Sequence, residues 1–161
     1  MITINYSDII KEYNNILKYA KNTCDFFSVI TELKKTYSKV PPDCAHDDLL
    51  IPLKEYMFKQ LVGIRKWSNS GTNSNHKVMN VYNCNKHSIK VLLDMKSILD
   101  IDSIYPEDIC FYRDSTVWLS TVTHENLSFM YQATDDDIIF LKNNNIRFSI
   151  GEKEKPFILR Y

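Results

Sequence analysis

The 161-residue chain is 44% hydrophobic, 12% aromatic and 25% charged, which is the composition of a globular protein. A chain of this length buries enough surface to fold without a metal or a disulfide, so we expect a single domain over 1–161 and no cofactor. Its 20 basic residues balance its 20 acidic residues, which argues against a basic nucleic-acid-binding face and against an acidic nucleic-acid mimic.

Three stretches in the first third of the chain carry apolar residues at spacings of three and four, which predicts helices. They cover 9–20, behind Ser7 as the N-cap, and then 26–33 and 53–64. We therefore expect residues 1–67 to form a helical subregion of about three helices.

The segment SNSGTNSN, residues 68–75, is the clearest break in the sequence, because Ser, Asn and Gly favour turns and loops. We place there the boundary between the helical subregion and an α+β subregion over 76–161. Beyond the break, apolar spacing predicts a fourth helix that begins near Asn85 or Ser88. A short strand through the letters IKVLL is the alternative within 76–99.

After the turn IYPED the apolar residues recur with a period of two, which is the pattern of half-buried strands. RDST forms a tight turn between the first two of these strands. Thr134 and the three aspartates after it predict the N-cap and acidic first turn of another helix. Helices followed by a mostly antiparallel β-sheet, with one or two helices packed on it, make an α+β fold. The predicted strands cover 109–112, 117–119, 127–131, 146–150 and 157–159.

The expected location follows from the start of the sequence and from the cysteines. The letters MITINYSDII lack the basic start and uninterrupted apolar core of a signal peptide. No stretch approaches the roughly 18 apolar residues of a membrane span, so we expect no membrane partner. The four cysteines form no CxxC pair, which favours reduced thiols in a cytoplasm. Frequent Asn, Lys, Ile and Tyr indicate an AT-rich, bacterial coding genome.

His124 and Glu125 are the residues most suggestive of catalysis, because an imidazole and a carboxylate can act as acid and base. The sequence has neither the second His of an H-E-x-x-H zinc protease nor the P-C-x-x-C of a zinc deaminase. Adjacent strand residues point to opposite faces, so we expect a polar strand start in which the two side chains do not meet. The alternative is a small hydrolase or nuclease in which Asp114 joins this pair.

Two Cys–His pairs, Cys44-x-His46 and Cys84-x-x-His87, together offer the four ligands of a tetrahedral zinc site. The first spacing is shorter than is usual for such sites, and neither pair has the expected Gly-containing turn. We therefore expect polar loops and no bound metal at these residues. The aspartates at 135–137 lack the alternating spacing of a calcium loop and are assigned to a helix start.

Because the sequence has no complete catalytic motif and no metal site of the usual spacing, we expect the protein to bind another protein. Tyr, Trp and Arg are enriched at the centres of protein interfaces, and the chain has many of them. A non-enzymatic protein-binding module fits, and one class of such modules is the bacterial immunity protein, which binds and neutralises a cognate toxin. The residues expected to contact the partner are Tyr112, Arg113, Trp118, His124 and Glu125.

A regulatory nucleic-acid binder is the remaining alternative. It requires a continuous basic stripe on the surface, because phosphate contacts supply most of the affinity. The residues that would form this stripe are Arg65, Lys66, Lys77 and Lys86.

Overall fold

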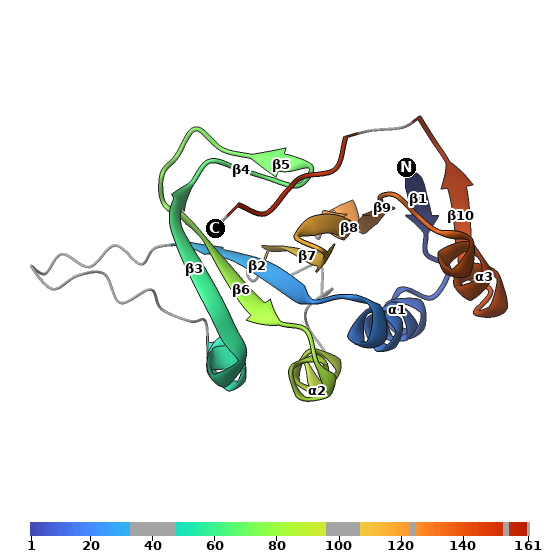
Figure 1. Ribbon diagram of the computed structural model, residues 1–161, viewed down its shortest axis with the longest axis horizontal. Helices are drawn as coiled ribbons and strands as arrows, with labels where there is room; N and C mark the ends of the chain where they lie inside the picture. Colours follow the sequence, from blue (N-terminus) through green and yellow to red (C-terminus); the bar gives the residue numbers. More distant parts are fainter. Residues whose placement is uncertain (33–47, 96–106, 123–124, 153–154, 161) are drawn as a thin grey trace, which may run out of the picture.

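The computed structural model describes residues 1–32, 48–95, 107–122, 125–152 and 155–160 (Figure 1). Within these residues the helices are α1 (Ile9–Thr23), the 3-10 helix η1 (Asp48–Tyr56), α2 (Lys86–Asp94) and α3 (Asp135–Asn143). The strands are β1 (Ile2–Asn5), β2 (Phe26–Glu32), β3 (Met57–Ile64), β4 (Lys66–Trp67), β5 (Ser70–Gly71), β6 (Lys77–Asn83), β7 (Glu107–Arg113), β8 (Thr116–Val122), β9 (Leu127–Met130) and β10 (Arg147–Ile150).

Eight strands of the described residues form one antiparallel sheet in the order β10-β1-β9-β8-β7-β2-β6-β3. Neighbouring strands alternate in direction, so β1 and β2 run the same way although three strands lie between them. Helix α1 carries the chain across those three strands, whereas α2 and α3 each cross one strand. Figure 1 shows these helices and η1 on one face of the sheet, with the β4–β5 hairpin and residues 155–160 over the other face.

The face that the helices cover carries the larger hydrophobic core, which we name the helix-side core. Its strand residues alternate with residues of the opposite face, as the strand period of two requires. Phe27 and Phe111 belong to this core, whereas their neighbours Phe26 and Tyr112 belong to the other face. The helix-side core includes Phe27, Phe111 and Trp118 from strands, Ile16 and Leu17 from α1, Leu53 from η1, Leu92 from α2 and Leu141 from α3.

The opposite face carries a smaller core, the hairpin-side core, under the β4–β5 hairpin and the segment 155–160. The sheet contributes most of its members, while Trp67 comes from the hairpin and Leu159 from the C-terminal segment. Its buried residues are Ile30, Trp67, Met79, Val81, Cys110, Tyr112, Val117, Tyr131 and Leu159. Both faces of the central strands are therefore buried.

Helix α1 confirms the helix predicted over 9–20, but its N-cap differs from the predicted one. The cap is Asp8, whose side chain accepts from the backbone N–H of Lys11 at 3.1 Å. Ser7, the predicted cap, instead donates its hydroxyl proton to the carboxylate of Glu12. The Asp8 carboxylate, one residue later than Ser7, accepts a hydrogen bond from the first turn equally well, because Asp and Ser are similarly good N-caps.

The predicted starts of the two later helices are confirmed. In α2, Asn85 and Ser88 form a capping box, in which each side chain bonds the other residue's backbone N–H. In α3, Thr134 and Asp137 do the same. Residues 77–83 before α2 form β6, and the letters IKVLL lie in α2 rather than in a strand.

Two segments predicted to be helical are strands, and this part of the fold prediction is wrong. Residues 26–32 form β2, and residues 57–64 form β3 after the end of η1. Strand β2 lies inside the sheet with both faces buried, so its apolar residues form a nearly continuous run that also satisfies helical spacing. In addition, β1 precedes α1, so the chain does not begin with a helical bundle.

The α+β class and the large antiparallel sheet are confirmed. Strands β7, β8, β9 and β10 correspond to the four strand predictions between 109 and 150, with Tyr131 and Ile146 just outside β9 and β10. Asp114 and Ser115 have φ values of 47° and 63°, so the RDST turn is a two-residue hairpin turn that matches the strand twist. Over 157–159 the structure has one isolated bridge, between Thr116 and Ile158, in place of the predicted strand.

The break at 68–75 contains β5 and joins two elements of the same sheet, because β3 before it pairs with β6 after it. Among the described residues, no helix combines the length and the apolar character needed to cross a bilayer.

Candidate functional site

Of the three residues expected to form a catalytic group, the structure describes Asp114 and Glu125, which lie at opposite ends of β8. Asp114 is exposed in the turn before β8, where its backbone N–H donates to Asp25 Oδ2 at 2.9 Å. Glu125 is exposed after the other end of β8, and His124 lies outside the described residues. Strand β8 has seven residues, so roughly 20 Å separates the two carboxylates. Asp114 and Glu125 therefore cannot act on one substrate atom.

Two of the residues expected to contact a partner are core residues in the structure. Tyr112 is fully buried, and its hydroxyl hydrogen-bonds Ser28 Oγ at 2.8 Å. Trp118 is 2% exposed and packs in the helix-side core. Neither side chain presents surface to a second molecule in this conformation.

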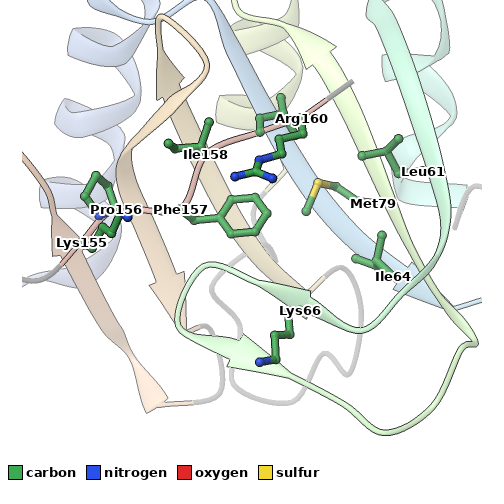
Figure 2. Close-up of a pocket in the computed structure, with 10 residues that line it drawn as sticks. Leu61, Ile64, Lys66, Met79, Lys155, Pro156, Phe157, Ile158 and Arg160 are labelled. Carbon is green, nitrogen blue, oxygen red and sulfur yellow. The ribbon is translucent and has the colours of Figure 1, made fainter.

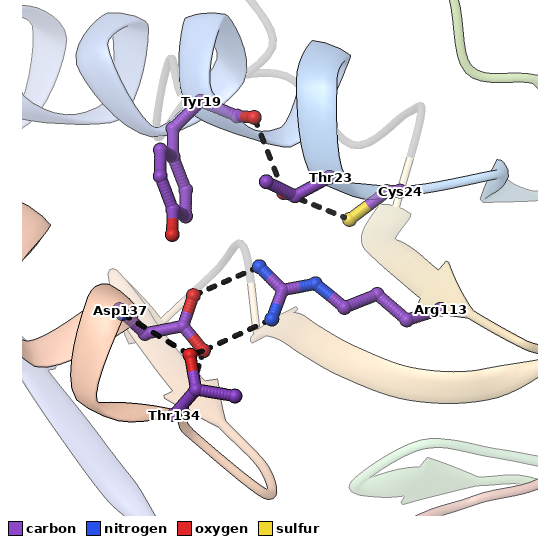
Figure 3. A network of polar contacts seen from close by, with 6 residues as sticks. All are labelled: Tyr19, Thr23, Cys24, Arg113, Thr134 and Asp137. Carbon is purple, nitrogen blue, oxygen red and sulfur yellow. Dashed lines mark hydrogen bonds and ion pairs between the residues drawn. The ribbon is translucent and has the colours of Figure 1, made fainter.

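Arg113, the third of these residues, forms a bidentate ion pair with the buried carboxylate of Asp137 (Figure 3). The two N–O distances are 2.9 and 2.8 Å, and the guanidinium lies 4.3 Å from the ring centroid of Trp118. Burial alone would raise the pKa of Asp137, but hydrogen bonds from Arg113 and Thr134 outweigh it and lower that pKa. The pair joins β7 to the start of α3 and has a structural role.

Of the four proposed zinc ligands, Cys44 and His46 lie outside the described residues. The Cys84 thiol donates to the Ala20 carbonyl oxygen at 3.6 Å, and burial raises its pKa. The His87 ring instead stacks on the ring of Tyr56. Within the described part of the chain, no three His, Cys, Asp or Glu side chains converge as a metal site would require.

The surface instead offers a hollow of about 390 Å³ on the hairpin-covered face of the sheet (Figure 2). We name it the C-terminal groove, because most of its lining comes from the segment 155–160. It is lined by Leu61, Ile64, Lys66, Met79, Lys155, Pro156, Phe157, Ile158, Leu159 and Arg160. Among these residues, Lys66 was predicted from the sequence as a candidate binding residue.

The sheet supplies the apolar floor of the C-terminal groove. Leu61 of β3 and Met79 of β6 are cross-strand partners and therefore point to the same face. A bulge between Val62 and Ile64 inserts an extra residue, with Gly63 at a φ of +73°. Because of this extra residue, Ile64 also lines the groove although it follows Leu61 by three positions.

The C-terminal segment forms the opposite wall and is fastened to the β7–β8 hairpin. The Val117 N–H donates to the Phe157 carbonyl at 3.0 Å, and the Leu159 N–H donates to the Ser115 carbonyl at 2.8 Å. Leu159 is 3% exposed and anchors the segment in the hairpin-side core. Figure 2 shows the Phe157 ring extending from this segment toward Met79, with the Arg160 guanidinium beside that ring.

The β4–β5 hairpin closes one end of the groove and is held by side-chain hydrogen bonds. Trp67 Nε1 donates to Asp108 Oδ2 at 2.8 Å, and Asn69 Nδ2 donates to Ser120 Oγ at 2.6 Å. The Tyr131 hydroxyl also donates to the side-chain carbonyl of Asn69. These bonds tie the hairpin to β7, β8 and the end of β9, so the position of Lys66 is set by a packed framework.

All the charged residues that line the C-terminal groove are basic. Lys66, Lys155 and Arg160 are exposed at its margin, and none of the residues that line it is acidic. None of them is His, Cys, Ser or Thr either, so the lining lacks the side chains that most often act as nucleophile or general base. The groove can hold an apolar group and attract negative charge beside it.

Of the four basic residues proposed as a nucleic-acid stripe, Arg65, Lys66 and Lys77 lie near one end of β6, whereas Lys86 lies beyond the other end. Lys66 and Lys77 are near the same end of β6, since Lys77 pairs with Ile64. Lys86 begins α2 beyond the other end of that seven-residue strand, which is roughly 20 Å away.

A local signal for the groove does exist in the sequence, because the apolar letters PFIL are enclosed by Lys155 and Arg160. Neither a protein-family model, nor a curated protein, nor a solved structure matches the chain. The function therefore has to be inferred from the residues of the C-terminal groove.

Proposed function

We propose that the protein is a non-enzymatic protein-binding module and that the C-terminal groove is its docking surface. The observation that carries this proposal is the combination of an apolar floor, a margin of exposed cations and a lining without a typical catalytic group. Protein interfaces have the same organisation, with an apolar centre inside a polar rim. Arg160 and Phe157 are also residue types that are enriched at interface centres.

The exposure of two large apolar side chains, one in the groove and one elsewhere on the hairpin-covered face, supports the same proposal. Ile158 lines the groove and is 46% exposed. Phe58 of β3 is 47% exposed, and its ring lies 4.7 Å from that of Phe26, which packs against the hairpin-side core. Covering such side chains by a partner is favourable by about 25 cal/mol for each Å² of apolar surface removed from water.

Within this class we propose a bacterial immunity protein, which binds and neutralises a cognate toxin. Such a protein needs only a stable scaffold and one complementary surface, and it needs no catalytic group. The small size of the chain and the fastening of both groove walls to the sheet agree with that requirement. The decisive observation would be loss of a toxin's activity in a stoichiometric complex with this protein.

The docking surface can be tested with two matched isoleucine variants. In Ile158→Asp a carboxylate enters the apolar contact, so we expect at least a tenfold loss of affinity for the native partner, about 1.4 kcal/mol. Ile139→Asp is the control, because Ile139 is 53% exposed but lies on α3, on the opposite face of the sheet. The measurement is quantitative capture of the partner from the native host by the tagged wild-type and variant proteins.

Two results would contradict the proposal. The first is an equal loss of capture in the Ile158→Asp and Ile139→Asp variants. The second is turnover of phosphodiester or ester substrates by the purified protein that disappears in His124→Ala, because this would establish an enzyme.

A further inference from the structure

The three cations of the C-terminal groove come from separate positions around its apolar floor. Lys66 lies on the β4–β5 hairpin, while Lys155 and Arg160 lie at the two ends of the C-terminal segment. Figure 2 shows the Arg160 guanidinium beside the Phe157 ring, with Lys66 and Lys155 farther from it in two other directions. A ligand seated on the floor therefore meets positive charge in several directions and no carboxylate of the lining.

The size of the hollow limits what can enter it. Its volume is about 390 Å³, which leaves room for one or two large apolar side chains of a docking segment. Phe157 suits such a guest, because its half-buried aromatic ring gives a flat apolar contact.

We infer that the C-terminal groove binds an acidic segment of the partner protein, which places a large apolar side chain against Phe157 and Ile158 and carboxylates beside Lys66, Lys155 and Arg160. This inference rests on the proposed protein-binding function and adds the chemistry of the partner. Arg160 contributes most to specificity, because a guanidinium can hold a carboxylate through two parallel hydrogen bonds. The lysines act mainly by attracting and orienting the segment.

Other anionic macromolecules fit these features less well. A membrane surface favours side chains that protrude from the protein, whereas the floor of this groove is recessed. A nucleic acid needs a longer series of phosphate contacts than three cations provide. Vesicles and oligonucleotides therefore serve as comparison probes in the test.

The test measures binding of the full-length protein to fluorescein-labelled ten-residue peptides by anisotropy. One set has Phe or Leu flanked by Asp and Glu, a second set replaces the acids with Asn and Gln, and a third replaces the apolar residue with Ala. We expect the acidic apolar set to bind at least tenfold more tightly than either other set. That preference should shrink between about 0.1 and 1 M salt, as the Debye length falls from about 10 to 3 Å.

Charge-reversed variants locate the binding site. Arg160→Glu and Lys155→Glu should each weaken binding of the acidic apolar peptides at least tenfold, because attraction becomes repulsion. Lys18→Glu is the matched control, since Lys18 is an exposed cation on α1, on the other face of the sheet. All replaced residues are exposed, and circular dichroism at increasing temperature verifies that each variant keeps its fold.

The inference is overturned if the acidic and neutral peptides bind equally, or if Lys18→Glu weakens binding as much as Arg160→Glu. Tighter binding to phosphatidylserine-containing vesicles or to a single-stranded oligonucleotide than to any peptide would also overturn it.

Capture of the native partner distinguishes the proposed protein-binding function from the proposed acidic segment. If capture depends on Ile158 but not on Arg160 or Lys155, protein binding stands and the acidic segment is rejected. If capture depends on none of these residues, both proposals are rejected.

Discussion

At the scale of single residues, the surroundings of the Arg113–Asp137 pair show why Arg113 and Trp118 were expected to contact a partner although they help to hold the core. Arg, Tyr and Trp are enriched at interfaces, but the same side chains also build cores. Trp118 lies under the Arg113 guanidinium, and Tyr19 stacks on Phe140 at a centroid distance of 4.1 Å beside them. Composition cannot separate these two roles, because only the folded chain shows which face a strand residue occupies.

Removing Arg113 should destabilise the protein. In Arg113→Met the Asp137 carboxylate, whose side chain is 0% exposed, loses its cationic partner. We expect the free energy of unfolding to fall by about 3 kcal/mol, the lower end of the range for a broken buried pair, because Arg113 is partly exposed. Urea denaturation measures the change, and Lys18→Met, an exposed cation on α1, should change stability by less than about 0.5 kcal/mol. Equal effects of the two replacements would contradict a structural role for the pair.

The same pair should make stability depend on acid pH. The pKa of Asp137 is lowered from its ordinary value of 3.8 in the folded protein. Its carboxylate therefore adds stability at pH values above the unfolded-state pKa, and this stability is lost as the pH falls through the folded-state pKa. Thermal midpoints between pH 6 and pH 2 should fall more steeply for the wild type than for Asp137→Asn, which has no carboxylate there to protonate. Parallel curves for the two proteins would show that the pair does not contribute to acid sensitivity.

At the scale of elements, the Gly63 bulge in β3 decides which side chains form the groove floor. In a regular strand Leu61 and Ile64 would point to opposite faces, because side chains alternate with a period of two. The bulge adds one residue and turns both toward the C-terminal groove. Gly63 suits this position because its φ of +73° is strained for any residue with a Cβ atom.

Replacing Gly63 should therefore affect both stability and binding. We expect Gly63→Ala to lower the free energy of unfolding by about 1–2 kcal/mol, the cost of left-handed backbone in a residue with a Cβ atom. Gly151→Ala is the control, since the added Cβ would lie 3.9 Å from the Met1 carbonyl oxygen, an ordinary contact. Urea denaturation compares the two variants. A Gly63→Ala protein that is as stable as the Gly151→Ala protein would show that the bulge does not need glycine.

Sequence patterns predicted some elements and missed others for identifiable reasons. The starts of α2 and α3 were predictable because Asn85 and Thr134 carry local capping signals that do not depend on the rest of the fold. Strand β2 was missed because its position inside the sheet depends on partners far along the chain, β6 and β7. The groove was missed for the same reason, since residues near 61, 79 and 157 become neighbours only when the sheet and the C-terminal segment have assembled.

At the scale of the whole molecule, the two faces of the sheet are covered unequally. Three α-helices and η1 cover one face of the described structure, while a short hairpin and a six-residue segment cover part of the other. The incomplete cover leaves the hollow of about 390 Å³ beside β3 and the segment 155–160. A docking segment from another protein would complete this layer, which places the proposed binding function on the thinly covered side of the sheet.

The position of β1 between β9 and β10 has a consequence for how the protein reaches its native state. Ile2 pairs with Met130 on one side and with Ile150 on the other, so β1 has no partner in the sheet until the residues of β9 and β10 have been synthesised. Pairings between such distant residues slow folding, because a large loop must close before the contacts form. During synthesis the unpaired edges of the strands that have already formed can pair with the wrong strands. A chaperone would therefore help most during this interval.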